Sequence, residues 1–171
     1  MALPEDLSLG HWNQMVDSFH QESDRGAAII AGSFVEHALG AYLRYRTGNK
    51  GELAEKLFGA TGPLSSFSQR IAVAYAFDLI SFQFYADLEA IRKIRNHFAH
   101  HPMETTFVTQ RVQQWIERLS LFRVAQETPE VAMKNVHRKA YIITCGFVSG
   151  SILDSIESNR KEPLTQPVER S

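Results

Sequence analysis

The chain has 171 residues, of which 44% are hydrophobic and 22% are charged, and its formal net charge is −1. A chain of this length suits one domain that buries a sizeable core, so folding needs no disulfide or structural metal. The near-neutral charge excludes a global field that would draw the protein onto nucleic acid or membrane, so any nucleic-acid site must be a local basic patch. The single cysteine, Cys145, excludes a disulfide within the chain, and its apolar neighbours predict a buried side chain.

No stretch of the sequence has the features of a signal peptide or a membrane anchor. Residues 1–6 are acidic and have no apolar core. The longest apolar stretch, residues 140–153, contains two glycines and is shorter than the roughly 20 residues that cross a bilayer. We therefore expect a cytoplasmic protein that makes no membrane contact.

Apolar residues recur at spacings of three and four along the whole chain, which predicts helices and no strands. The expected helices, in chain order, cover residues of about 5–20, 23–46, 52–58, 66–80, 82–100, 107–122 and 129–158. The clearest start is Ser66, which has the spacing of a capping box with Gln69. Pro102 ends the helix before it, because proline disfavours the α conformation in the preceding residue.

These elements predict an all-α fold, a single-domain bundle of five to seven helices. We assign residues 1–158 to the helical domain and residues 159–171, which are polar and contain two prolines, to a mobile C-terminal tail. Short linkers predict that neighbouring helices pack antiparallel. No helix pair carries an outward basic recognition face, so we do not expect sequence-specific DNA binding.

The end of the predicted helix 82–100 carries the motif Arg95-Asn96-His97-Phe98-Ala99-His100. Histidine can take and give a proton near neutral pH, the fork-shaped guanidinium of arginine suits a phosphate, and asparagine can orient either group. These groups can cleave RNA through its own 2′-hydroxyl without a metal. We therefore predict Arg95, Asn96 and His100 as catalytic residues, with His100 as general acid or base and Arg95 stabilising charge on the phosphate.

Cationic and imidazole side chains around this motif form a local basic patch. The candidates for RNA binding are Arg92, Lys93, His97 and His101. No acid occurs between Glu89 and Glu104. Histidines four residues apart could instead ligate a metal ion, but no carboxylate has the spacing of a zinc hydrolase helix. We expect no metal and no cofactor.

The position of Arg95 raises a geometric problem. Arg95 and His100 are five residues apart, so on a regular helix they point about 140° apart. One ligand can contact both only if the arginine reaches round, the helix end unwinds, or a second subunit completes the site. Arg95 also borders the buried stripe of its helix, where its charge needs a partner. It then either lines a cleft or pairs with an acid, for which Asp78 and Asp87 are the candidates.

The motif Arg95-Asn96-X-X-Ala99-His100 at a helix end resembles the signature of the HEPN superfamily. The resemblance implies a HEPN-like helical bundle, commonly dimeric, in which these three polar residues form a metal-independent RNA endonuclease site at the dimer cleft. Many members of the superfamily are toxins or defence effectors, which implies an antitoxin or another protein partner. Others have lost activity and only bind partners.

A wider resemblance covers about residues 20–101. The segments that carry it are residues 22–28 (ESDRGAA), 62–68 (GPLSSFS), 70–76 (RIAVAYA) and 87–96 (DLEAIRKIRN). Together they resemble the MltR family, which is named for the mannitol operon repressor. This resemblance implies a helical protein with no recognisable DNA-reading motif.

Two functions remain open on the sequence. The first is a HEPN-type RNA endonuclease that is expected to assemble as a homodimer, and the alternative is a non-enzymatic MltR-type regulator that acts through protein–protein contacts. A third interpretation is a solvated helix end, because histidines suit the C-terminal end of a helix dipole. An Arg95 and a His100 that converge on one cleft favour the nuclease. An Arg95 that forms a bidentate pair with Asp78 or Asp87 and faces away from His100 favours the regulator.

Overall fold

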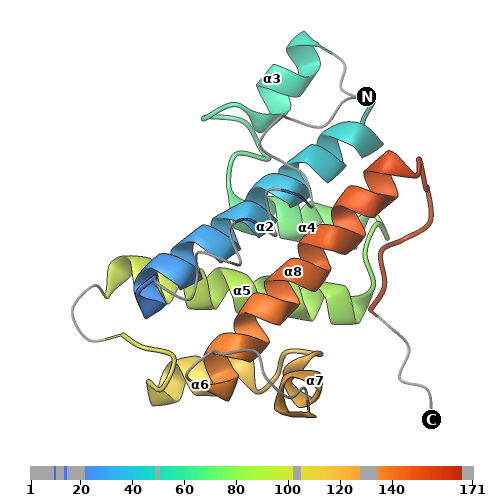
Figure 1. Ribbon diagram of the computed structural model, residues 1–171. Coiled ribbons are helices and arrows are strands. Elements are labelled where there is room, and N and C mark those ends of the chain that lie inside the picture. Colours follow the sequence, from blue (N-terminus) through green and yellow to red (C-terminus); the bar gives the residue numbers. More distant parts are fainter. Residues whose placement is uncertain are drawn as a thin grey trace.

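The computed structural model describes residues 22–48, 51–101, 105–127 and 135–166, together with Gly10 and Gln14. Within these residues the chain forms seven helices and no strand (Figure 1). They are α2 (Asp24–Arg46), α3 (Glu52–Phe58), α4 (Phe67–Ala76), α5 (Phe82–His100), α6 (Gln110–Ile116), α7 (Phe122–Glu127) and α8 (Val136–Glu157). The predicted all-α, single-domain bundle is therefore confirmed. Most of the helix expected at residues 5–20, and Pro129 as the start of the last helix, lie outside the described residues.

Local capping residues set where several helices begin. Ser23 caps α2 by accepting a hydrogen bond from the backbone N–H of Gly26, and Ser66 forms the predicted capping box with Gln69. Ser81 caps α5 in the same way as Ser23 caps α2. The predicted bounds of α3 and α5 are confirmed. Sequence signals are enough here because a cap bonds groups within one turn of itself.

The apolar stripe predicted over residues 107–122 is divided between α6, a turn and the start of α7. Val108, which the sequence places in the stripe, is 60% exposed. The turn is held by another helix, since the backbone N–H and the hydroxyl of Ser120 both donate to the carboxylate of Asp87 on α5, at 3.0 and 2.5 Å. A contact between distant parts of the chain therefore decides the break, and local periodicity cannot reveal it.

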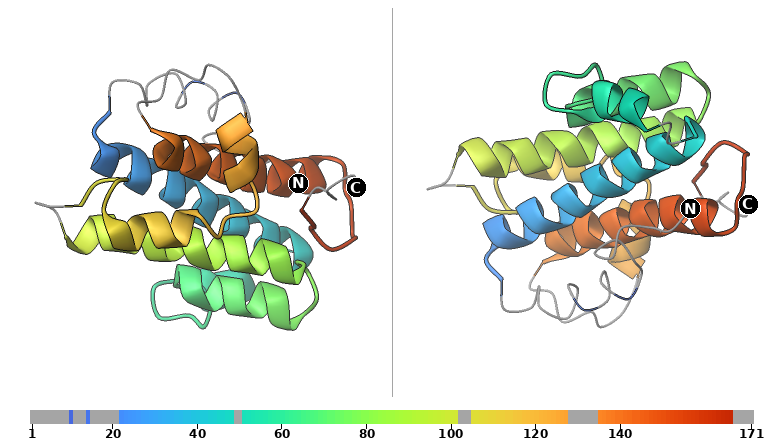
Figure 2. Two further views of the ribbon diagram at one scale, coloured as in Figure 1. Left: turned by 90° about the horizontal axis from the view of Figure 1, so that it is seen from below. Right: turned by 90° about the horizontal axis from the view of Figure 1, so that it is seen from above.

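The three long helices α2, α5 and α8 form the centre of the bundle (Figures 1 and 2). α2 and α8 run side by side in the same direction, because Arg138 joins Asp24 at their starts and Tyr45 donates to Asn159 at their ends. α5 crosses both in the opposite direction, and α4 packs on α5 and α2. The antiparallel packing expected of helices joined by short linkers does not apply to α2 and α8. Several helices separate these two in the chain, so no short linker sets their relative direction.

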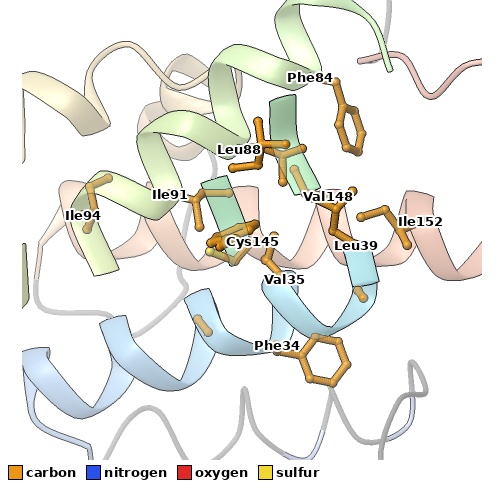
Figure 3. Packing of buried hydrophobic residues seen from close by; sticks show 14 of the residues in the cluster. Phe34, Val35, Leu39, Phe84, Leu88, Ile91, Ile94, Cys145, Val148 and Ile152 are labelled. Atoms are coloured by element: carbon orange, nitrogen blue, oxygen red, sulfur yellow. The ribbon is translucent and has the colours of Figure 1, made fainter. Parts of the chain in front are cut away.

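Apolar side chains of α2, α5 and α8 meet between these helices and form the core (Figure 3). Leu39, Leu88 and Val148 have no exposed surface. Cys145 lies among them, fully buried as the sequence predicts, and burial raises the pKa of its thiol far above its usual range. α2 is long and apolar enough to cross a membrane by length and composition, but 67% of that stretch is buried inside the bundle, which is typical of a core helix.

Gly32 lets α2 approach α5 and α8 closely. A Cβ atom at Gly32 would lie 2.8 Å from the Cβ of Arg95 and 2.8 Å from the hydroxyl oxygen of Tyr141. The same hydroxyl donates to the carbonyl of Ala28 on α2 at 2.9 Å. This close contact brings the stem of Arg95 against α2 and so determines what its guanidinium can reach.

Part of the segment assigned to the C-terminal tail packs on the bundle. Leu164 is 6% exposed, and its carbonyl accepts a hydrogen bond from the N–H of Ser81 at 2.8 Å. Its own N–H donates to the carbonyl of Leu79 at 3.0 Å. The polar composition of the segment conceals these contacts, because they consist of backbone hydrogen bonds and one apolar side chain. Residues 167–171 lie outside the described residues.

Candidate functional site

A pocket of about 490 Å³ lies between the C-terminal end of α5 and α6. The residues that line it are Arg92, Lys93, Asn96, His97, His100 and His101 from α5 and its C-terminal cap, and Arg111 and Trp115 from α6. Six of the seven predicted site residues therefore share one pocket. The exception is Arg95.

Arg95 turns away from this pocket toward α2. Its Nη2 donates to Oε2 of Glu36 at 2.9 Å, and its Nη1 donates to Oδ1 of Asn96 at 2.9 Å. Both members of the ion pair are largely buried, with side chains 29% and 19% exposed. The guanidinium that the sequence offers to a phosphate is thus bound to a carboxylate of the same chain.

The two acids predicted as partners of Arg95 are the wrong ones. Asp78 is exposed in the turn between α4 and α5. Asp87 is fully buried, but its carboxylate binds Ser120, and burial raises its pKa while the hydrogen bonds from Ser120 lower it in part. The actual partner, Glu36, lies 59 residues before Arg95, and only the crossing of α2 and α5 brings the two together.

Asn96 connects the Arg95–Glu36 pair to the pocket. Its Oδ1 accepts the hydrogen bond from Arg95, while its side chain lines the pocket beside His100. Because the amide oxygen already accepts this bond, the amide nitrogen is the donor that remains for a ligand. Arg95 therefore affects the pocket through Asn96 and not by direct contact.

Three histidines line the pocket, and two of them are in ring contact. The ring centroids of His97 and His101 are 4.3 Å apart, and Trp115 meets His97 edge to face at 5.5 Å. Burial lowers the pKa of His97, and the charges of His101 and Arg111 lower it further. Adjacent cations repel, so a nearby anion would favour the protonated form of His97.

The cations of the pocket differ in how far their charge is neutralised. Arg92 donates to both carboxylate oxygens of Glu89 at 3.0 and 2.9 Å, and the Nζ of Lys93 lies 3.9 Å from the same carboxylate. The guanidinium of Arg111 lies over the ring of Trp115 at 5.2 Å, and no acid among the described residues pairs with it. Arg111 therefore carries the least compensated positive charge in the pocket.

The site residues predicted from the sequence do not include Arg111, and Trp115 falls in the helix expected at residues 107–122 with no role assigned to it. Trp115 is partly buried against the core and also lines the pocket. A signal was present, because the two residues are four apart and share one helix face, where an arginine can stack on a tryptophan. The position of α6 beside the end of α5 is a tertiary feature, and the sequence pattern does not contain it.

The described part of the chain contains no group of three histidine, cysteine or acidic side chains arranged to hold a metal ion. His97 and His101 therefore have no third protein ligand there. The Nδ1 atom of His101 also lies 3.1 Å from the carbonyl oxygen of His97, which occupies one of its ring nitrogens. The arrangement does not favour the metal-binding alternative.

Exposed aromatic side chains gather where α4 turns into α5, at the other end of α5 from the pocket. We call this surface the aromatic corner, and its members are the exposed Tyr75, Phe77 and Phe82 and the half-buried Tyr85. Phe77 is 72% exposed and Phe82 is 65% exposed. The rings of Tyr75 and Tyr85 stack at 4.6 Å, and Phe82 lies 6.3 Å from Tyr75. Residues 71–91 contain no lysine or arginine, so this surface is not basic.

The turn at the aromatic corner ends α4 with a Schellman motif. The N–H of Leu79 donates to the carbonyl oxygen of Ala74 at 2.9 Å. The N–H of Asp78 donates to the carbonyl oxygen of Tyr75 at 3.0 Å. Asp78 adopts the left-handed conformation that this motif requires, with φ of 52°. The chain reverses sharply here, which leaves Phe77 on the outside.

The pocket can bind an anion and can exchange protons, because it combines arginine, lysine, an amide and imidazoles. An RNA-cleaving site of the predicted type also needs Arg95 and His100 on one phosphate. The two side chains point to different sides of α5 within this chain, as their five-residue spacing indicates.

Comparison with known proteins identifies the family. The profile of the family described as the mannitol repressor (MtlR) matches residues 52–162, which is more than half of the chain. No curated protein and no solved structure matches the chain. The matched stretch includes the aromatic corner and the pocket, whereas α2 with Glu36 precedes it. As the wider resemblance predicts, the chain belongs to the mannitol repressor family.

Proposed function

We propose that this protein is a cytoplasmic transcriptional regulator of the mannitol repressor type that acts by binding a protein partner. The pairing of Arg95 with Glu36 carries the proposal, because it keeps the guanidinium outside the pocket that His100 lines. Without that arginine the pocket lacks the group to which the predicted RNA-cleaving site assigns the stabilisation of charge on the phosphate. Membership of the family supports a regulatory role.

The aromatic corner is the surface that we assign to the protein partner. Clustered, exposed aromatic side chains are typical of protein–protein contacts, because they bury a large apolar area. The exposed acid Asp78 and the absence of lysine and arginine from residues 71–91 disfavour a nucleic-acid backbone at this surface. The complementary partner presents an apolar surface with a basic rim.

Transcript measurements in the organism that carries the gene test this function. Deleting the gene is expected to raise mannitol-operon transcripts, and both the wild type and His100→Ala are expected to restore repression. The double variant Phe77→Ser/Phe82→Ser is expected to fail, because it removes the exposed aromatic surface. Leu53→Ser on α3, where Leu53 is 51% exposed, is the matched control and is expected to repress. Repression that needs His100 but not the two phenylalanines would contradict the proposal.

A metal-independent RNA endonuclease of HEPN type is the second candidate. The observation that favours it is Asn96, which binds Arg95 and also lines the pocket beside His100. Purified wild type, Arg95→Ala and His100→Ala are incubated with total RNA and with tRNA in EDTA. If the protein is a non-enzymatic regulator, as we propose, the RNA is expected to stay intact in all three reactions. Cleavage by the wild type alone, with cyclic-phosphate ends, would establish the nuclease.

Two further predictions belong to the nuclease candidate. One is a homodimer in which the second subunit supplies an arginine to the site, and the other is an antitoxin as the protein partner. Light scattering on the purified chain measures the mass in solution. A monomer without RNA cleavage removes this candidate.

A further inference from the structure

The pocket between α5 and α6 combines an uncompensated cation with several proton acceptors. Arg111 is exposed, and no acidic side chain in the described part of the chain pairs with it. The described residues that line the pocket are basic, imidazole, amide or aromatic, and none is a carboxylate. Such a pocket is electropositive and attracts an anion.

The pocket is open to solvent, and its volume and lining can accommodate a small anionic ligand. A volume of about 490 Å³ is within the range of small-molecule sites. Arg111 offers a planar fork of N–H donors to an anionic group, and the amide nitrogen of Asn96 offers one more. The ring of Trp115 provides an apolar wall for the carbon atoms of the ligand. These features suit an anionic group on a small organic molecule.

The histidines make the affinity for an anion sensitive to protonation. His97 and His101 stack at 4.3 Å between centroids. The charged groups beside them are Arg92 and Lys93 on α5, which both pair with Glu89, and Arg111 on α6. Burial and the charges of His101 and Arg111 lower the pKa of His97, and a bound anion with two negative charges opposes this effect.

We propose that this pocket binds the phosphate group of a small phosphate monoester, and that at least one of its histidines takes up a proton when the ester binds. A phosphate monoester carries about −1.5 to −2 charges at pH 7. A phosphodiester carries one negative charge, so it stabilises an added proton on a histidine less than a monoester does. The 19 residues of α5 extend about 27 Å, so the ligand site and the aromatic corner lie at opposite ends of one helix. The inference therefore does not depend on the partner that we assign to the corner.

Calorimetry on the full chain tests binding and proton uptake together. The probes are inorganic phosphate, ribose 5-phosphate, unphosphorylated ribose, and a short single-stranded RNA without terminal phosphates. Each titration is made at several pH values from slightly acidic to slightly basic, in two buffers that differ in ionisation enthalpy. The difference in heat between buffers gives the number of protons taken up. Ribose 5-phosphate is expected to bind with net proton uptake and to bind more weakly as the pH rises above 7, whereas ribose is expected not to bind.

Matched variants assign the binding to this pocket. Arg111→Ala is expected to weaken ribose 5-phosphate binding about tenfold or more, because it removes charge-assisted hydrogen bonds. Arg25→Ala, which removes an exposed cation on α2, is expected to leave the affinity unchanged. His97→Asn is expected to reduce the number of protons taken up, whereas His37→Asn on α2 is expected to leave it unchanged. Circular dichroism confirms that each variant is folded.

Three results would overturn the inference. The first is no binding of ribose 5-phosphate or inorganic phosphate at millimolar concentration. The second is binding that Arg111→Ala does not weaken, which would place the ligand elsewhere. The third is RNA that binds more tightly than the monoester without proton uptake, which would make a phosphodiester chain the occupant.

Discussion

The Nη2 atom of Arg95 on α5 lies 2.9 Å from the Oε2 atom of Glu36 on α2, and the two residues are 59 positions apart in the chain. Their ion pair joins the two helices near Gly32, where α2 approaches α5 closely. The arginine that the sequence offers as a catalytic group is therefore part of a helix–helix contact. Any chemistry of the neighbouring pocket depends on other side chains.

Removing the carboxylate of Glu36 is expected to destabilise the fold. Glu36→Ala leaves the largely buried guanidinium of Arg95 with Asn96 as its one remaining side-chain partner among the described residues. Because both side chains keep some contact with water, the expected loss is about 1–2 kcal/mol in the free energy of unfolding. Urea denaturation measures it. A double-mutant cycle with Arg95→Ala is expected to give a coupling energy of about 1 kcal/mol.

The ion pair between Arg44 and Glu55 is the matched control for that cycle. It joins α2 to α3, and its members are 30% and 75% exposed. Solvent screening makes such pairs contribute little, so its coupling energy is expected to be close to zero. Equal coupling in the two cycles would show that burial does not strengthen the Arg95–Glu36 pair.

Gly32→Ala is expected to destabilise the bundle by about 1–3 kcal/mol, because an added methyl group overpacks the contact of α2 with α5 and α8. The new Cβ would meet the Cβ of Arg95 and the hydroxyl of Tyr141, each at 2.8 Å. Thermal or urea denaturation measures the change. Ser33→Ala, one residue along α2, is the control and is expected to change stability by about 0.5 kcal/mol or less. A Gly32→Ala protein as stable as wild type would mean that the helices separate without cost.

Asp87 is expected to make stability depend on pH. Burial raises its pKa above the usual 3.8, so the folded state holds this proton more tightly than the unfolded state does. Its contribution to stability is complete below pH 3.8 and is lost as the pH rises through the folded-state pKa. The Asp87→Asn variant has no carboxyl group that ionises at this position. Its free energy of unfolding, relative to that of the wild type, is therefore expected to rise as the pH rises from 3.8 through the folded-state pKa of Asp87. Urea denaturation at several pH values measures the trend, and a constant difference between the proteins would contradict it.

Asp78→Gly is expected to stabilise the protein by about 0.5 kcal/mol, since glycine adopts the left-handed conformation without steric cost. Asp78 has φ of 52° and is exposed in the turn that ends α4. Asp78→Val is the comparison, because a β-branched residue is strained at positive φ and is expected to lower stability. The urea midpoints rank the three proteins. A valine variant more stable than the glycine variant would refute the backbone argument.

His97 is expected to titrate below its usual value of 6.5, because burial and the charges of His101 and Arg111 lower its pKa. Arg111→Ala removes one of these charges and is expected to raise the titration midpoint of His97 in an NMR experiment. Arg25→Ala is the control and is expected to leave it unchanged. Because the folded-state pKa is lowered, the stabilising contribution of neutral His97 is lost as the pH falls through that pKa. A midpoint that does not respond to Arg111→Ala would mean that the two groups do not interact.

Several features of this protein follow from its sequence alone. The helices α3 and α5 have the bounds that the sequence predicts, the capping box of α4 forms as its spacing predicts, and Cys145 is buried as its apolar neighbours predict. The basic patch at the end of α5 was also recognisable from residues that are close in sequence. Caps, helix faces and local charge depend on contacts within one or two turns, and a linear pattern contains that information.

Only the tertiary structure decided which groups the site brings together. Glu36 reaches Arg95 because α2 crosses α5 at Gly32, and Arg111 reaches the pocket because α6 packs beside the end of α5. Helix packing also sets the parallel direction of α2 and α8. It likewise brings Asp87 to the turn at Ser120. These contacts join residues that are distant in the chain, and their partners are selected by how whole helices pack. Local periodicity and propensity carry no information about that choice.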